Sequence, residues 1–312
     1  ADSTFIYDNG ELIYADTGMS FNTNVVATSY GKHWVIATAK DENDMVSDSM
    51  YYFVRHDAIV EELPEGIKDG INYIDENTAT LCLLAPEKEY IFVLGDFNDW
   101  EIENDYEMKI TPDGLRYWVE LSNLEDGKEY VFQYFIDGTI KVGDPYADKV
   151  SDPWNDQYIS NATYPDLISY PAGKTYGIAS VLQTGQVAYE WQINNFTNPN
   201  VEDLVIYELL VRDFITKHDF NTLIDTLDYL ERLGINAIEL MPNSEFEGNS
   251  SWGYNPNYYF APDKYYGPKD TFKAFVDECH SRGIAVFMDL VLNHSNNTNA
   301  MAMMYWNSEY NR

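Results

Sequence analysis

A carboxylate, an amide and an imidazole stand close together at the end of one apolar segment, as Asp289, Asn293 and His294. The segment, residues 284–292 (IAVFMDLVL), predicts a strand buried on both faces. A carboxylate in such a strand costs free energy unless an Arg or a hydrogen-bond network satisfies it. Asp289 could be only a structural residue of that kind, and a lone His294 is more often structural than functional. Their position at the carboxyl end of a predicted parallel strand, where catalytic groups gather, favours a functional site.

The loop over residues 241–268 is dense in Tyr, Trp, Asn and Pro. Flat aromatic rings beside amide groups suit a sugar, because the rings stack on its C–H faces while the amides bond to its hydroxyl groups. The alternative is that these residues only cover the end of the fold. We interpret the loop as a candidate carbohydrate-binding segment.

These residues must be positioned by a chain whose pattern changes near residue 204. Up to that point, short stretches of alternating Val, Ile, Tyr, Phe and Thr are separated by turn residues, which predicts β-structure. The alternation breaks near residues 63–66 (LPEG), so two small sandwiches are the simplest interpretation. We predict part of a small sandwich over 1–60, which resembles an immunoglobulin-like one, a second sandwich over 61–165 and a connector over 166–203.

From residue 204 on, the pattern alternates between strands and helices. The order β-α-β-α-β predicts parallel strands with helical crossovers, in either a doubly wound sheet or a (β/α)8 barrel. No Gly-rich phosphate loop follows the first strand, which disfavours a nucleotide-binding sheet. A whole barrel needs about 250 residues, so we predict that 204–312 holds the first three strands of an incomplete TIM barrel. The predicted strands are 204–211, 235–242 and 284–292, and the predicted helices are Asn221–Gly234 and Asp270–Gly283.

The charge balance narrows the class of ligand. The chain has 19 Lys and Arg against 52 Asp and Glu, a formal net charge of -33 at pH 7. So acidic a surface repels phosphate backbones and anionic lipid, and it is compatible with neutral ligands and divalent cations. No apolar run reaches the roughly 18 residues of a spanning helix. Cys82 and Cys279 fall in different predicted domains, so we expect two buried thiols rather than a disulfide or a metal pair.

Four motifs in the same order resemble the α-amylase family, the retaining α-glucan glycosidases. The motifs are VIYELLVRDF, GINAIELMP, the segment that begins WGYNPNYYFAPDKYYGP, and VFMDLVLNH. The resemblance is to pullulanase-like, isoamylase-like and branching-enzyme-like members, although Leu210 stands where many of them have His. Residues 61–165, with FVLGDFNDW and DPYAD, are similar to the early-set, glycogen-binding-like sandwich that precedes such barrels. The resemblance covers about 61–312.

Position by position, the resemblance implies roles for four residues. Asp289 would organise the floor of the site, and His294 would bond to hydroxyl groups of the sugar at the cleavage subsite. Tyr254 would supply the stacking platform for that sugar. Asn293 matches a position that ligates a structural calcium ion in many members, although several members lack the ion. An amide oxygen suits Ca²⁺, but the sequence does not supply the other five or more oxygens.

The resemblance also implies where catalysis does not take place. The nucleophile, the general acid and the third carboxylate of the family lie on or after its fourth, fifth and seventh strands, and this sequence ends at Arg312. Retaining hydrolysis needs two carboxyl groups facing each other across the bond. We therefore expect the nucleophile and the acid/base beyond Arg312, and no hydrolysis by these residues alone.

The predicted function is hydrolysis of an α-glucan such as starch, glycogen or pullulan, by an enzyme of which this chain is the N-terminal portion. Two alternatives stay open: a branching transferase of the same family, and a non-catalytic glucan-binding protein. The expected partner is an α-glucan, with no nucleic acid and no membrane-spanning segment; the bond cleaved and the oligomeric state are not fixed. We expect an extracellular, periplasmic or cell-surface location. Trp100 and Trp118 either form a glycan-binding face or pack inside the second sandwich, and the second is expected.

Overall fold

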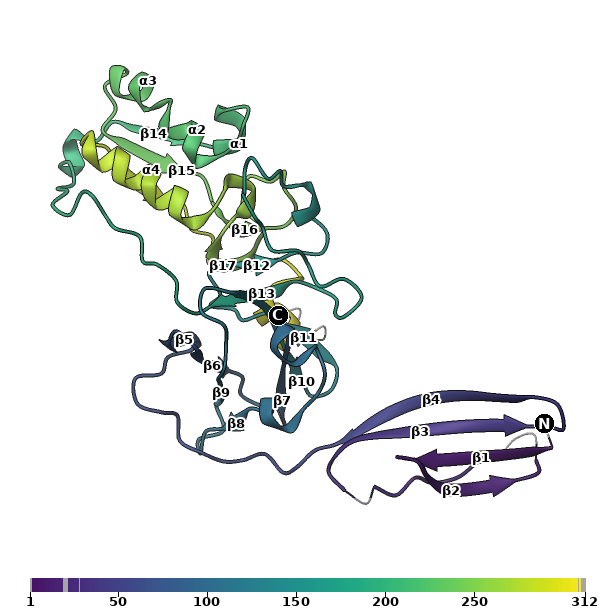
Figure 1. The fold of residues 1–312 in the computed structure, drawn as a ribbon. Helices are drawn as coiled ribbons and strands as arrows, with labels where there is room; N and C mark the ends of the chain where they lie inside the picture. The colour runs from purple at the N-terminus through teal and green to yellow at the C-terminus, as the bar shows by residue number, and fades with distance from the viewer. Residues whose placement is uncertain (1, 19–21, 28, 308, 310–312) are drawn as a thin grey trace.

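The computed structural model describes residues 2–18, 22–27, 29–307 and 309, which form three successive units (Figure 1). The units are a four-stranded sheet, a sandwich of two sheets, and a region of parallel strands and helices. Within the described ranges, no helix is long and apolar enough to cross a membrane.

The first unit is one antiparallel sheet with the strand order β2-β1-β3-β4. We predicted part of a sandwich for 1–60, and the described residues form a single sheet. Figure 1 shows this sheet projecting from the other units, which it meets where Phe53 packs edge-on against Phe92. The strands are β1 (Ser3–Asp8), β2 (Glu11–Asp16), β3 (Gly31–Lys40) and β4 (Met45–Val54).

The second unit is a sandwich whose two sheets bury one hydrophobic core. Leu81 and Val119 of the first sheet share this core with Phe132 and Tyr134 of the second. The first sheet has the order β5-β6-β9-β8, and the second has the order β11-β10-β13-β12 with β7 also paired to β10. The strands are β5 (Gly70–Asp75), β6 (Thr78–Leu84), β7 (Ile91–Gly95), β8 (Lys109–Ile110), β9 (Arg116–Leu121), β10 (Glu129–Ile136), β11 (Ile140–Val142), β12 (Val150–Ser151) and β13 (Ala179–Gln183).

The sandwich extends further along the chain than its predicted end at residue 165. Strand β13 lies inside the predicted connector, 166–203, and it pairs with β10 from Glu129↔Gln183 to Phe132↔Ser180. The Pro- and Gly-rich composition of this segment concealed one short strand. Its Ala, Val and Leu side chains are buried in the sandwich. The connector itself therefore begins after Gln183.

The third unit contains three parallel strands in the order β14-β15-β18, with helices packed on one face. Leu223 and Phe275 from the helices contact Ile238 from the sheet in one buried cluster. The order of strands and helices matches the prediction; closure into a barrel stays a prediction. The elements are β14 (Ile206–Leu209), α1 (Val211–Phe214), α2 (Phe220–Ile224), α3 (Leu227–Arg232), β15 (Ala237–Leu240), β16 (Ser244–Phe246), β17 (Pro256–Pro262), α4 (Lys269–Ser281), β18 (Ala285–Met288) and α5 (Ala300–Tyr305), and the 3-10 turns are η1 (Asp96–Asn98), η2 (Asn104–Tyr106), η3 (Asp156–Tyr158), η4 (Val201–Asp203) and η5 (Lys264–Tyr266).

The helix predicted over Asn221–Gly234 is two short helices, α2 and α3. Asp219, rather than Asn221, caps the first by accepting a hydrogen bond from the Thr222 N–H at 2.7 Å. The Thr226 hydroxyl then donates to the Leu223 carbonyl at 2.7 Å. Such a local side-chain bond competes with the helical ladder and interrupts it.

The second and third units are joined by a shared core and by buried charges. Tyr258 of β17 and Met304 of α5 belong to the sandwich core. Lys264, 2% exposed, pairs with Glu245 of its own unit and with Asp156 of the sandwich loop, whose Oδ1 lies 3.3 Å from Nζ. Buried partners of opposite charge fix the position of one unit against the other, because separating them would leave a buried charge unpaired.

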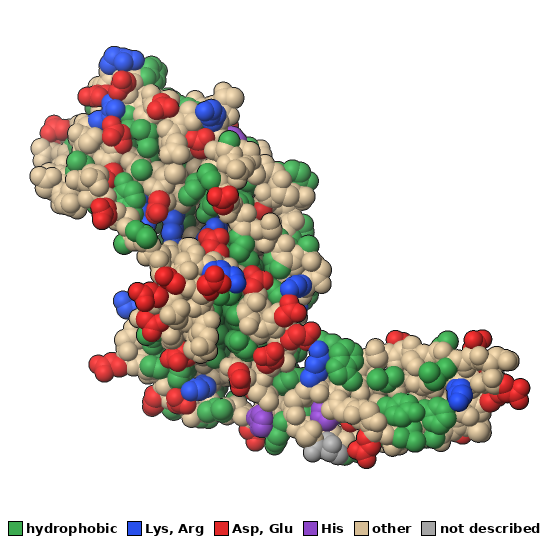
Figure 2. All heavy atoms as spheres, in the orientation of Figure 1, with side chains coloured by type: hydrophobic (Ala, Val, Ile, Leu, Met, Phe, Trp, Pro, Cys, Tyr) green, Lys and Arg blue, Asp and Glu red, His purple; other side chains and the backbone are tan. Residues whose placement is uncertain are grey.

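The prediction for the two cysteines is confirmed. Cys82 and Cys279 are both free and buried, with pKa values raised by burial. Figure 2 shows the Asp and Glu side chains spread over the visible face of the molecule instead of gathered in one patch. The negative charge therefore acts as a solvated surface on that face.

Candidate functional site

The three parallel strands end at one edge of their sheet. In register, Leu209 of β14 stands beside Leu240 of β15, which stands beside Met288 of β18. Asp289 follows Met288 directly, and its N–H donates to the Leu240 carbonyl at 3.0 Å. Asp289 thus lies at the carboxyl edge, the place where parallel α/β folds carry their functional groups.

Tyr254 reaches this edge from the loop between β16 and β17. Its hydroxyl donates to Oδ2 of Asp289 at 2.6 Å. This hydrogen bond is the main cause that raises the pKa of Tyr254 to about 12. Because Tyr254 is 39% exposed, its ring stays accessible while its hydroxyl is held. The sequence left an Arg or a hydrogen-bond network open as the partner of Asp289, and the structure shows a hydrogen bond from a tyrosine hydroxyl.

His294 contacts the same loop through its ring. A carbonyl oxygen only accepts hydrogen bonds, so Nε2–H of His294 donates to the Tyr254 carbonyl at 2.6 Å. The hydroxyl of Tyr259 donates to the carbonyl of His294 at 3.2 Å. These bonds fix the orientation of an exposed imidazole. In the part of the chain that the structure describes, Nδ1 of this ring has no partner.

A close backbone contact brings Tyr254 to this position. Gly253 has φ +88°, and a Cβ there would lie 2.1 Å from the carbonyl oxygen of Pro242. Only glycine allows the loop to pack so tightly against the end of β15. Arg212, which follows β14, donates to the Ser251 carbonyl at 3.0 Å and holds the same loop. The ends of β14 and β15 therefore both position Tyr254.

Two carboxylates near the site were missed from the sequence. Glu208 of β14 and Glu239 of β15 are register partners, and both raise the pKa of Tyr254 through their negative charge. Leu209 and Leu240, which alternate with them, are buried against the helices, so the glutamates lie on the opposite face. The sequence contained a signal for both glutamates. Each is a carboxylate in a strand predicted to be buried, and the same pattern indicated Asp289. Together the three carboxylates make this face electronegative.

Asn293 stands apart from these contacts. Asp289 and His294 each bond to Tyr254, whereas Asn293 is exposed and makes no side-chain hydrogen bond within the described residues. Among the described residues, no group of three or more His, Cys, Asp or Glu side chains could hold a metal ion. One exposed amide does not supply the six to eight oxygens that calcium takes. The calcium assignment of Asn293 therefore stays a prediction, and no step proposed below uses the ion.

Trp100 and Trp118 are inside the sandwich. They are 7% and 4% exposed, and each indole N–H is satisfied, the first by Asp96 and the second by the Glu61 carbonyl. A ring this buried has no free face to stack on a sugar. Both tryptophans therefore pack inside the sandwich, as expected.

Comparison with known proteins identifies the family that the unit of parallel strands resembles. The family model for the alpha-amylase catalytic domain matches residues 192–310. This range contains the three strand ends, Tyr254, Asp289 and His294. The resemblance to the α-amylase family of glycoside hydrolases is thereby confirmed.

Curated relatives extend the similarity into the sandwich. Malto-oligosyltrehalose trehalohydrolase of Saccharolobus solfataricus is 34% identical over 200 residues, which are 64% of this chain and 32% of that protein. The 1,4-alpha-glucan branching enzyme GlgB of Photobacterium profundum is 32% identical over 223 residues, 67% of this chain and 28% of that protein. The chain thus spans about a third of the length of these relatives.

Solved structures give the same fold. A Salmonella typhimurium protein described as an alpha amylase has a TM-score of 0.59 and 25% identity, over 76% of this chain and 35% of that one. The GBS pullulanase SAP, solved in complex with maltotetraose, has a TM-score of 0.55 over 74% of this chain and 34% of that one. At 20% identity, the second likeness concerns the fold alone.

Proposed function

We propose that this chain is part of a retaining α-glucan hydrolase and that Tyr254, Asp289 and His294 hold one sugar unit of its substrate. The observation that carries the proposal is the pair of contacts that join these residues, from the Tyr254 hydroxyl to Asp289 and from the His294 ring to the Tyr254 carbonyl. The loop that carries the exposed ring of Tyr254 is thus bonded to both Asp289 and His294.

Each residue supplies a different part of sugar recognition. The ring of Tyr254 offers a flat face to the C–H groups of a pyranose. Asp289 accepts one bond from Tyr254 and has further lone pairs for a sugar hydroxyl. His294 uses Nε2 within the protein, which leaves Nδ1 for the ligand. Glycoside cleavage builds positive charge on the sugar ring, and the negative face with Glu208 and Glu239 favours that charge.

The chemical step requires groups that this arrangement does not provide. A retaining mechanism places two carboxyl groups about 5–5.5 Å apart on either side of the bond. Asp289 is bonded to Tyr254, and we assign it to binding rather than to attack. The nucleophile and the acid/base are proposed to lie in the remainder of the whole protein, beyond the third that this chain represents.

A second candidate is branching transfer, favoured by the identity to a relative named as a branching enzyme. The whole protein, incubated with amylose, distinguishes the candidates. New reducing ends without new α-1,6 links support hydrolysis, and new α-1,6 links support branching. Release of trehalose from a maltodextrin ending in trehalose would support the reaction after which another relative is named. Binding of amylose with no covalent change would support the non-catalytic alternative and overturn the proposal.

A further inference from the structure

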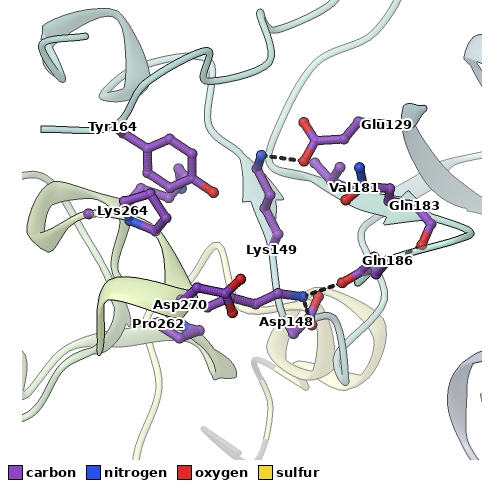
Figure 3. Close-up of a pocket in the computed structure, with 13 residues that line it drawn as sticks. Glu129, Asp148, Lys149, Tyr164, Val181, Gln183, Gln186, Pro262, Lys264 and Asp270 are labelled. Atoms are coloured by element: carbon purple, nitrogen blue, oxygen red, sulfur yellow. Dashed lines mark hydrogen bonds and ion pairs between the residues drawn. The ribbon is translucent and has the colours of Figure 1, made fainter. Parts of the chain in front are cut away.

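A cavity of about 150 Å³ lies between the sandwich and the parallel unit, and Tyr254, Asp289 and His294 are not among the residues that line it. One wall comes from the sandwich, with Glu129 at the start of β10 and Lys149 just before β12. The other wall runs from Pro262 at the end of β17 to Asp270 at the start of α4. Figure 3 shows the charged and amide side chains that surround the space.

The volume suits one six-membered ring. An apolar cavity of about 150 Å³ engineered into a lysozyme accepts benzene, and the same space filled with solvent would hold about five water molecules at roughly 30 Å³ each. A pyranose is also a six-membered ring, and its hydroxyl groups would replace those water molecules. A second ring would not fit inside the cavity.

Two hydrogen-bonding side chains in the cavity have unused capacity. The hydroxyl of Tyr164 has no partner in the described part of the chain, and Figure 3 shows it directed toward Lys149. Lys149 gives one of its three N–H groups to Glu129, whose Oε1 lies 2.6 Å away. Its Nζ also lies 4.9 Å from the centre of the Tyr164 ring. Burial raises the pKa of Tyr164 and lowers that of Lys149. The cavity thus presents a neutral phenol and an ammonium with free donors.

The charges around the cavity are already paired, so a ligand there gains little from a charge of its own. Lys149 pairs with Glu129, and Lys269 lies 2.6 Å from Oδ2 of Asp148. Lys264 pairs with Glu245 and Asp156, as described above. Val181, Pro262 and Pro268 supply the apolar parts of the lining. Apolar patches beside unused polar groups match a neutral ring with C–H faces and a hydroxylated rim.

We propose that this cavity binds one neutral hexopyranose unit and that Tyr164 and Lys149 bond to its hydroxyl groups. The unit could come from a free monosaccharide or from the end of an oligosaccharide. Because the two walls belong to different units of the fold, an occupied cavity also stabilises their contact. The cavity is separate from the Tyr254 site, so a failure to bind sugar in the cavity would leave the proposed function untouched.

Calorimetric titration of the full chain with glucose and with maltotriose tests the proposal. We expect saturable glucose binding that Tyr164→Phe weakens by about 3- to 10-fold, the effect of losing one neutral hydrogen bond. Tyr158→Phe is the matched control, because this tyrosine lies six residues earlier in the same loop and is 73% exposed. Binding should be unchanged in that control. The melting temperature of each variant verifies folding.

The remaining outcomes decide the source of the ligand or overturn the site. If glucose binds at least as tightly as maltotriose, the ligand is a free monosaccharide. If maltotriose binds more tightly, and Tyr164→Phe weakens its binding as much as that of glucose, the ligand is the end of a chain. Two results contradict the proposal: no saturable binding of either sugar, or binding that Tyr164→Phe leaves intact. Saturable binding of inorganic phosphate in place of glucose would also contradict it.

Discussion

The hydroxyl of Tyr254 donates a 2.6 Å hydrogen bond to Oδ2 of Asp289, which is 35 residues away in the chain. This bond connects an aromatic loop to the end of a parallel strand. It orders the phenol without burying the ring. The candidate site depends on this connection, because the loop and the strand end would otherwise present their side chains independently.

The loop geometry predicts that Gly253→Ala destabilises the fold more than another Gly→Ala change at positive φ. Its new Cβ would meet the Pro242 carbonyl at 2.1 Å in addition to the strain of φ +88°. Gly283→Ala is the control, because Gly283 has φ +72° and nothing within 4 Å. The control should lose about 1–2 kcal/mol, the cost of a left-handed residue. Urea unfolding should show a larger loss for Gly253→Ala, and equal losses would refute the tight packing.

The buried ion pairs between the two larger units give a second prediction. Lys264→Met should lower the free energy of unfolding by about 3–5 kcal/mol, because it leaves buried carboxylates without their cation. Lys273→Met is the matched control. Lys273 pairs with Asp270 at the surface, where such a pair contributes about 0–1 kcal/mol. A Lys264 variant as stable as the control would mean that the cluster is not formed.

Asp144 predicts how stability depends on pH. It is buried, accepts from the Tyr134 hydroxyl at 2.7 Å, and has a pKa raised by burial from 3.8 to about 6. Between these values the folded state binds more protons than the unfolded state. The stabilisation is therefore complete below about pH 4 and is lost as the pH rises through 6, by about 3 kcal/mol.

The measurement is urea unfolding at pH 5 and pH 8, for the wild type and for Asp144→Asn. The wild type should be the more stable at pH 5, and the asparagine variant should show a smaller difference between the two pH values. Asp263, whose pKa is raised to about 7 by burial, has the same sign and keeps some dependence in the variant. An unchanged pH dependence in Asp144→Asn would show that this carboxyl does not titrate as stated.

Sequence patterns pointed to residues that the structure brings together, and they missed one strand of the sandwich. Apolar strands with polar ends indicated Asp289 and His294, since burial makes a polar residue informative. The same pattern at Glu208 and Glu239 was overlooked. Strand β13 was missed because a short strand among turn residues gives too little alternation to recognise. The bond between Tyr254 and Asp289 depends on the close approach at Gly253, which is a property of the three-dimensional fold.

If these residues bind the sugar and the nucleophile and acid/base lie elsewhere, residues 1–312 should not hydrolyse amylose on their own. Two carboxyl groups must face each other across the bond. Asp289 is bonded to Tyr254, and Glu208 and Glu239 lie side by side on neighbouring strands of one sheet. Reducing ends should not accumulate when this chain is incubated with amylose. Asp289→Asn, prepared identically, controls for contaminating amylase. Turnover in the wild type that this variant lacks would contradict the proposal.

The most direct test of the central claim is kcat/KM for amylose of the whole protein carrying Asp289→Asn. The substitution keeps the size of the side chain and removes its charge. If Asp289 holds the sugar and Tyr254, kcat/KM should fall by about 10- to 100-fold, the effect of losing hydrogen bonds to a charged group. Asp225→Asn, at an exposed carboxylate between α2 and α3, should be without effect. A folded Asp289→Asn enzyme with wild-type kcat/KM would contradict the account.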